Sequence, residues 1–267
     1  DGNLDAWERL WRVCKDGVGG IAAYQKLLGN DPDGTRNPDH EVLLDPDNLI
    51  DYMLVIFYGG NLDAPITSFG ANRSANNWYG IRNRNGDEGF RYYVWDAEHT
   101  FLEVDQDRTG PYPAGDEYAR SNPQWIWQQC LHNAEFRMRV ADRVHKHFNH
   151  GGVLASKSVA GLLNKRVAKL RLAVIGESAR WGNPHSSNWA PPSRGGGGNR
   201  PRTLDDDWEP EVDRWLNEYI PARSGVVVDQ LWKHGLIPDL EPARLVKRGG
   251  VVAVSYTHLT LATNREV

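Results

Sequence analysis

The stretch that decides the fold is DPDNLIDYMLVIFYGGNLD, residues 45 to 63. Asp45 can cap a helix, and Pro46 suits the first helical position because no backbone N–H is needed there. The apolar residues that follow cover a broad surface, which is typical of a buried helix. Gly59 and Gly60 end the pattern. The stretch therefore predicts a buried helix that delivers Asp63 to a loop anchored by a rigid element.

The residues on either side of this helix carry their own local signals. Residues 4–17, LDAWERLWRVCKDG, place apolar side chains at helical spacing and predict an amphipathic helix. Residues 29–41 are dense in Gly, Pro, Asp and Asn, which indicates an irregular loop. Residues 76–96, NNWYGIRNRNGDEGFRYYVWD, predict a β-hairpin with strands at 78–82 and 90–95.

The second half of the chain is mostly helical by pattern. Residues 125–148 and 159–182 predict two long helices, and the Gly- and Pro-rich residues 186–202 predict a flexible linker. Residues 208–235 predict a final pair of helices, split near Pro221. We therefore expect an α+β fold that is mainly α, with a small hairpin and a helical C-terminal part.

One domain is expected over residues 1–240, followed by a tail at 241–267. Residues 251–267, VVAVSYTHLTLATNREV, differ in composition from what precedes them and look like translated adapter read-through, so we assign them no function. The alternative is a genuine β-forming tail. The chain begins at Asp1 and enters a helix pattern almost at once, which favours a fragment of a longer protein.

Bulk composition excludes several classes of function. The 31 basic and 35 acidic residues give a net charge of −4, so a general attraction to nucleic acids or anionic membranes is not expected. No apolar run approaches the about 18 residues of a membrane span. Cys14 and Cys130 are too few for a disulfide framework or a thiolate metal site, and we expect buried free thiols. The composition predicts a soluble domain.

Asp63, Asn77 and Asp96 are the candidate site. Asp63 follows the buried helix, and Asp96 follows the second strand of the hairpin. Asn77 precedes the first strand, so the folding back of the hairpin should place it beside Asp96. Two carboxylates and an amide oxygen in one cleft suit a hard cation such as Mg²⁺. The alternative for each Asp is a helix cap or turn former, which is the commoner role of an isolated Asp at the end of an element.

Two further polar residues follow Asp96. Glu98 could be a metal ligand, a general base or an ion-pair partner of a nearby arginine, and the sequence leaves these alternatives open. His99 follows an apolar strand, and we expect it to be a hydrogen-bonded structural residue rather than a ligand.

Several motifs occur together in this chain: YGGNLDAP, ANNWYGIRNR and FRYYVWDAEHTF, followed by ESARWG and IPARSGVVVDQLWKHGLIP. In this order they resemble the CotH kinase family, the spore-coat-protein-H-like atypical kinases of bacteria. The resemblance covers residues 1 to about 240 and is most specific through residues 45–101. It implies the C-terminal lobe of an atypical protein-kinase-like fold, with the hairpin at the active site.

The resemblance also implies residue roles. Asp63 would be the catalytic residue, while Asn77 and Asp96 would bind Mg²⁺ or Mn²⁺. Glu98 stands where many members have a second Asp, so it keeps a carboxylate there as a further metal ligand. ATP would be the co-substrate, and Ser or Thr hydroxyls of a protein would accept the phosphoryl group. Further partners would be other domains of the same polypeptide, at an extracytoplasmic or cell-surface location.

The nucleotide side of a kinase site is absent from the sequence. Kinases use a glycine-rich lid and a lysine that contacts the phosphates, and neither has a counterpart here. We therefore expect weak or no ATP affinity for these residues alone, with the missing lobe supplied by a longer protein. Two other functions stay open: a degenerate kinase-like binding module, and a carbohydrate hydrolase whose carboxylates would lie about 5 to 9.5 Å apart.

Overall fold

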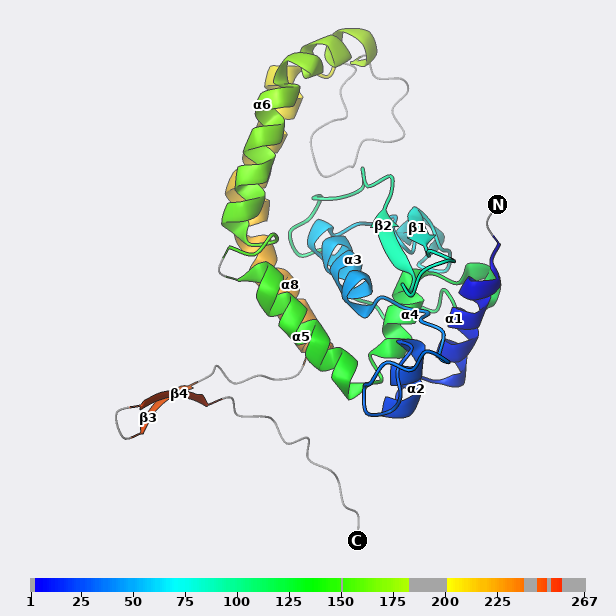
Figure 1. Cartoon of the computed structure of the whole chain (residues 1–267). Helices are drawn as coiled ribbons and strands as arrows, with labels where there is room; N and C mark the ends of the chain where they lie inside the picture. The colour runs from blue at the N-terminus through cyan, green and yellow to red at the C-terminus, as the bar shows by residue number, and fades with distance from the viewer. Residues whose placement is uncertain (1–2, 150, 183–200, 238–243, 249–250, 256–267) are drawn as a thin grey trace.

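A computed structural model describes residues 3–149, 151–182, 201–237, 244–248 and 251–255 and shows a mainly helical protein (Figure 1). This confirms the predicted α+β, mainly α class. The helices and strands of the main body are α1 (Asp5–Asp16), α2 (Ile21–Leu27), α3 (Pro46–Gly59), β1 (Trp78–Ile81), β2 (Arg91–Val94), α4 (Pro123–Cys130), α5 (Ala134–Phe148), α6 (Ser156–Trp181), α7 (Glu209–Arg214) and α8 (Ile220–Lys233).

Helix α3 is the centre of the core. The Asp45 carboxylate accepts a hydrogen bond from the Asn48 N–H at 3.0 Å, and Gly60 ends the helix in the left-handed conformation, with φ 58°. Its apolar side chains are buried, including Leu49 and Phe57. Helices α4, α5 and α8 and strand β2 all contact it. The predicted buried helix is confirmed, and its rigidity fixes where the chain emerges toward Asp63.

The hairpin is anchored to the beginning of α3. Strands β1 and β2 are antiparallel, with Trp78 opposite Val94. The Asn48 side chain accepts a hydrogen bond from the Tyr92 N–H at 2.5 Å, and the Phe90 N–H donates to the Leu43 carbonyl at 2.9 Å. One end of α3 thus holds the hairpin, while the other end leads to Asp63.

Gly89 lies where the hairpin meets the chain before α3. A Cβ atom here would lie 2.2 Å from the carbonyl carbon of Leu44 and 2.6 Å from the Asp45 nitrogen, both backbone atoms. We expect Gly89→Ala to lower the free energy of unfolding by about 1–3 kcal/mol, because the backbone must shift to remove the clash. Urea denaturation measures this change.

Gly161→Ala is the matched control. A Cβ atom at Gly161, inside α6, meets nothing within 4 Å, so alanine should raise the free energy of unfolding by about 0.5–1 kcal/mol through helix propensity. Equal effects of the two substitutions would contradict the close approach at Gly89.

The predicted helix over residues 125–148 is wrong, because α4 and α5 are separate helices. The break lies at residues 131–133, where the Asn133 side chain accepts a hydrogen bond from the Phe136 N–H and caps α5. The Asn133 side-chain amide also donates to the Gly19 carbonyl at 3.1 Å. A capping residue that is bound on both sides stabilises the turn over the continuous helix.

The predicted pair of helices corresponds to α7 and α8, whose boundary at Ile220 lies next to Pro221, but no break in the helical chain separates them. The chain is helical without interruption from Leu204 to Lys233, and π-helical segments occupy Leu204–Trp208 and Trp215–Tyr219. The second of these directly precedes the turn that contains Pro221. A wider π turn removes the need for the proline N–H and relieves the clash of its ring with the preceding turn.

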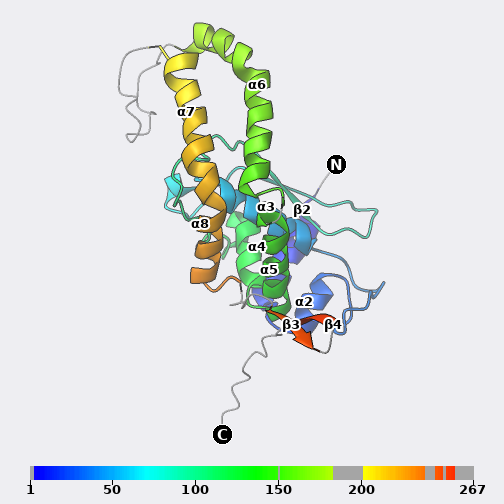
Figure 2. The same cartoon turned by 90° about the vertical axis from the view of Figure 1, so that its left-hand side faces the viewer.

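Helix α6 runs alongside α7 and α8, and these three helices extend beyond the rest of the body (Figure 2). None of the 26 residues of α6 is buried. Large apolar side chains on it are exposed, among them Leu162, Leu172 and Ile175. It therefore packs as an outer element, while α3 carries the core.

Arg223 in α8 is fully buried beneath the C-terminal end of α3. Its guanidinium donates hydrogen bonds to the carbonyls of Phe57 and Tyr58 in α3, and to those of Val104 and Gln106. Burial lowers the pKa of this group from its usual value. The Arg223 guanidinium therefore joins the end of α3 to the loop that follows the hairpin.

Cys14 and Cys130 are buried free thiols, as predicted. Their mutual hydrogen bond, and then burial, raise the pKa of the Cys14 thiol well above its usual value. Within the described residues, none of the helices combines the length and apolar composition that crossing a membrane requires.

Most of the predicted linker at residues 186–202 lies outside the described residues. In the tail, β3 (Arg244–Arg248) pairs with β4 (Val251–Ser255) in antiparallel register. That is the arrangement of a β-forming tail, and the non-native origin of residues 251–267 stays a prediction.

Candidate active site

Asp63 is held by the loop that leaves α3. Its N–H donates to the Asn61 side-chain oxygen at 2.8 Å, and only 9% of the residue is exposed. Its Oδ2 atom accepts hydrogen bonds from the side-chain amides of Asn76 and Asn77, both at 2.9 Å. Two amide donors therefore fix the plane of this carboxylate before any ligand binds.

A buried arginine supports the same loop. Arg108 is 2% exposed, and its guanidinium donates to the Asn72 side-chain oxygen at 2.8 Å and to the Ile66 carbonyl. Burial lowers its pKa, while the nearby charges of Tyr112, Asp107 and Asp63 act in the opposite direction. A positive charge thus lies behind the segment that carries Asp63.

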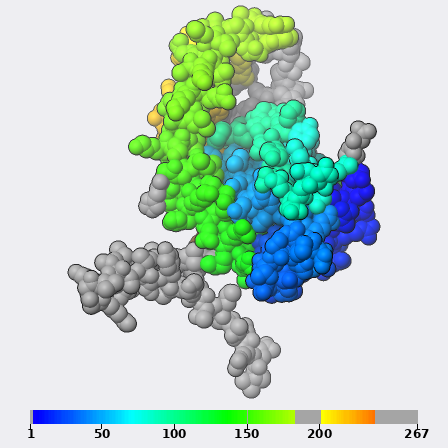
Figure 3. Space-filling model, in the orientation of Figure 1, coloured from blue at the N-terminus to red at the C-terminus, as the bar shows by residue number. Residues whose placement is uncertain are grey.

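The segment after β2 lies against the loop after α3. The Leu62 N–H donates to the His99 carbonyl at 3.1 Å, and the Phe101 N–H donates to the Gly59 carbonyl at 2.8 Å. In the space-filling view the hairpin region and the following loop, coloured cyan to teal, form a surface between α1 and α6 (Figure 3). Two backbone hydrogen bonds therefore place residues 96–101 beside Asp63.

Asn77 and Asp96 meet at the open end of the hairpin. The Asn77 side-chain amide donates to the Asp96 carbonyl at 3.4 Å as well as to Asp63. Both residues have left-handed backbones, with φ of 47° and 48°. Asn and Asp adopt this conformation more readily than other non-glycine residues, and such backbones are common at functional sites.

Asp63, Glu98 and His99 form a cluster. One ligand atom from each lies within 4.8 Å of the others, and the His99 Nε2 atom is 3.1 Å from a Glu98 carboxylate oxygen. The His99 ring packs edge-to-face on Phe69, with centroids 4.9 Å apart. Two acids and an imidazole thus converge on one space, a donor set that suits a divalent cation.

The structure separates the predicted site residues into two groups. Asp63 and Glu98 share the cluster, and Asn77 contacts it through its bond to Asp63. The Asp96 side chain is exposed and is not part of the cluster, although its backbone lies beside Asn77. Glu98 contacts the His99 ring nitrogen, whereas the sequence offers arginines as ion-pair partners.

Two residues at this site had no functional role in the sequence-based prediction. His99 is predicted to be structural rather than a ligand, and that role stays a prediction; its ring nitrogen lies in the cluster. Arg108 was not singled out at all. Its sequence signal is weak, since DQDR in a polar loop gives no indication that the arginine is buried.

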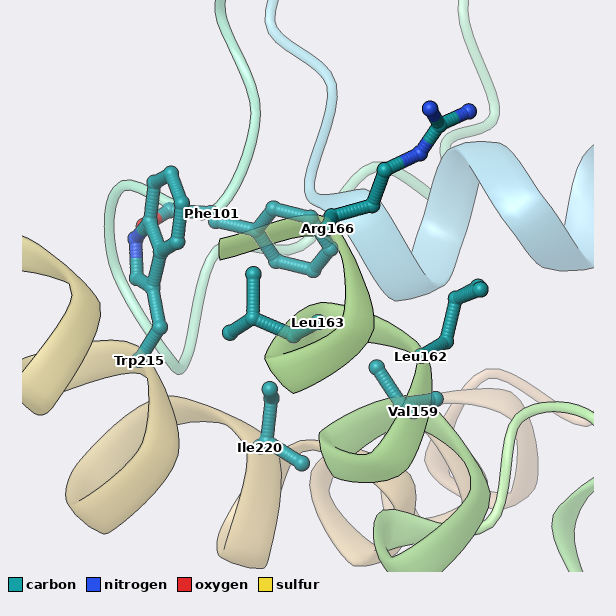
Figure 4. A pocket seen from close by; sticks show the side chains of 7 residues that line it. All are labelled: Phe101, Val159, Leu162, Leu163, Arg166, Trp215 and Ile220. Atoms are coloured by element: carbon teal, nitrogen blue, oxygen red, sulfur yellow. The ribbon is translucent and has the colours of Figure 1, made fainter. Parts of the chain in front are cut away.

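An apolar cavity of about 180 Å³ lies next to Phe101, at the end of the segment that follows β2. It is lined by Phe101, Val159, Leu162, Leu163, Arg166, Trp215 and Ile220. Figure 4 shows the Arg166 guanidinium pointing away from Leu163 and Ile220, so its aliphatic part lines the wall. The cavity offers packing surface and no acid–base group, and it is therefore not the candidate catalytic centre.

Comparison with known proteins gave one family. The family model described as CotH kinase protein matches residues 23–227. No curated protein and no solved structure matched the chain significantly.

Proposed function

Because this chain belongs to the CotH kinase family, we propose that it takes part in phosphoryl transfer from ATP to Ser or Thr hydroxyls of a protein substrate. The chain would act as part of a longer kinase-like protein and would use Mg²⁺ or Mn²⁺. The observation that carries the proposal is Asp63, a carboxylate nine-tenths buried and oriented by two asparagine amides.

Asp63 would orient the acceptor hydroxyl and take up its proton. The hydroxyl oxygen then forms a bond to the γ-phosphorus, the bond from that phosphorus to the bridging oxygen breaks, and ADP leaves. Positioning of the reactants supplies most of the catalysis in such reactions, since little covalent chemistry falls to the protein. Arg108 would assist indirectly, because its hydrogen bonds to the Asn72 side chain and the Ile66 carbonyl hold the segment that follows Asp63.

Asn77, Asp96 and Glu98 are the proposed metal ligands. Carboxylate and amide oxygens suit Mg²⁺, which retains several waters when bound to protein. The Asn77 amide nitrogen is turned toward Asp63, which leaves its oxygen for a cation. The cation that these residues would hold would supply positive charge to offset the charge of the nucleotide phosphates.

The hydrolase alternative would use Asp63 with either Asp96 or Glu98 as its two acids, about 5 to 9.5 Å apart. One side-chain oxygen each of Asp63 and Glu98 lies within 4.8 Å of the other and of a His99 ring nitrogen, a donor set that suits a cation. A degenerate binding module would keep the fold and lack metal and nucleotide affinity in the full-length protein.

Asp96→Asn tests the metal role. We expect it to weaken Mg²⁺-dependent ATP binding by the full-length protein by about 10-fold to 100-fold, since a contact to a charged group contributes about 1.5–3 kcal/mol. Calorimetric titration of ATP with and without Mg²⁺ measures this change. Asp39→Asn, on an exposed loop, is the control and should leave binding unchanged. Undiminished Mg²⁺-dependent binding by a folded Asp96→Asn variant would exclude Asp96 as a ligand.

A further inference from the structure

We infer that Asp63, Glu98 and His99 form a binding site for a divalent transition-metal cation such as Zn²⁺ or Co²⁺, which shares Glu98 with the Mg²⁺ position proposed above and adds Asp63 and a nitrogen ligand. Binding at this site would inhibit phosphoryl transfer, and that consequence alone rests on the proposed function. The metal binding itself follows from the three side chains.

The spacing of the cluster fits one small cation. Ligands at about 2.0–2.2 Å from a metal, with angles of about 90–110° between them, lie roughly 3.0–3.5 Å apart. The 3.1 Å separation of His99 Nε2 from the Glu98 carboxylate oxygen is of this size. The Asp63 ligand atom lies within 4.8 Å of both, so a modest side-chain movement completes three protein ligands.

The charges of the cluster also call for a cation. Two carboxylates face each other, and no lysine or arginine within the described part of the chain makes an ion pair with either of them. Asp63 is nine-tenths buried. Its Oδ2 accepts from two asparagine amides, while its Oδ1 has no hydrogen-bond donor among the residues that the structure describes. A divalent cation would offset this repulsion and use that oxygen.

His99 is positioned as a ligand before any metal binds. Its carbonyl accepts the Leu62 N–H at 3.1 Å, and its ring is packed against Phe69. The backbone bond joins the two loops that carry Asp63 and Glu98. The imidazole therefore needs little ordering when a cation arrives, which reduces the entropy cost of binding.

The imidazole determines the class of metal. Mg²⁺ and Ca²⁺ prefer oxygen ligands, whereas a nitrogen donor with two carboxylates favours Zn²⁺, Co²⁺ and related ions. A cation bound to Asp63 would occupy the carboxylate that accepts the hydroxyl proton. The site would therefore allow Mg²⁺ to support phosphoryl transfer and a transition metal to suppress it.

The test uses the chain without a polyhistidine tag and with Co²⁺ as probe, since its visible absorption reports coordination by nitrogen and oxygen. We expect saturable binding of one Co²⁺, displaced by Zn²⁺ and unaffected by Mg²⁺ at equal concentration. His99→Gln should weaken Co²⁺ binding by about 10-fold or more, because one of three protein ligands is lost.

His132→Gln is the matched control, since it removes an exposed imidazole next to α5 and should leave Co²⁺ binding unchanged. Far-UV circular dichroism checks the fold, and Glu98→Gln provides a second variant with the same expected loss. Absence of saturable Co²⁺ binding, equal effects of the two histidine variants, or displacement of Co²⁺ by equimolar Mg²⁺ would overturn the inference.

The outcome is independent of the kinase assay. Co²⁺ binding that depends on His99, in a full-length protein that transfers no phosphate, would support the metal site and contradict the proposed function. Phosphoryl transfer by a protein that shows no His99-dependent Co²⁺ binding would support the proposed function and contradict the metal site.

Discussion

Asp63→Asn should reduce phosphoryl transfer by the full-length protein by about 10²–10⁴-fold, the usual contribution of a positioned general base. The substitution keeps the shape of the side chain, and the amide oxygen can still accept from Asn76 and Asn77, which bind the native carboxylate. It removes the basic oxygen and the negative charge. Incorporation of labelled γ-phosphate into a Ser/Thr-containing protein, with Mg²⁺ present, measures the loss.

Asp87→Asn is the control for this experiment. Asp87 lies in the exposed turn of the hairpin, so the same chemical change there should leave the rate unaffected. Urea denaturation of both variants would show that each is folded. A folded Asp63→Asn variant with full activity would exclude Asp63 as the base and remove the main support for the proposed reaction.

Arg223→Met should lower the free energy of unfolding by about 2–5 kcal/mol. Methionine keeps much of the apolar volume but leaves the carbonyls of Val104 and Gln106 without their donor, and each unsatisfied group costs about 1–3 kcal/mol. The carbonyls of Phe57 and Tyr58 lose one donor each but keep the Gly60 N–H and the Tyr219 hydroxyl. Relief from burying a charge offsets part of this cost. Urea denaturation followed by tryptophan fluorescence measures the change.

Arg12→Met is the comparison. Arg12 is exposed and pairs with Glu8 one helical turn away, and an exposed pair of this kind contributes little to stability. Arg223→Lys is also informative, because an ammonium group keeps the charge but cannot reach carbonyls on both segments with a planar fork. Similar stabilities for Arg223→Met and Arg12→Met would show that the buried guanidinium is not the link between α3 and the following loop.

Local signals predicted the parts of the fold that local interactions determine. Helix α3 carries its own cap, its first-turn proline and its terminal glycines, and the hairpin carries its turn. The break at Asn133 was missed because the side chain that makes it also depends on a contact with Gly19, distant in sequence. The continuity of the helical chain through Pro221 was not predicted, because no residue pattern indicates a π-helical turn.

In the candidate site, too, some contacts follow from local sequence signals and others depend on the assembled fold. The proximity of Asn77 and Asp96 follows from hairpin geometry alone, and the structure has that contact. The approach of His99 to Asp63 depends on a backbone bond between two loops, from Leu62 to His99, and residue spacing gives no indication of such a bond. The same holds for Arg108, whose burial is a property of the assembled fold.

Helix α6 affects how the stability of this protein should be measured. A 26-residue helix that buries none of its side chains forms few interactions with the cooperative core and can unfold locally at low free-energy cost. Far-UV circular dichroism detects this long helix strongly, whereas Trp125 and Trp127, buried in the core, report on the global transition. The two signals need not change at the same denaturant concentration, so a two-state analysis of helicity alone would underestimate the stability of the part that holds Asp63.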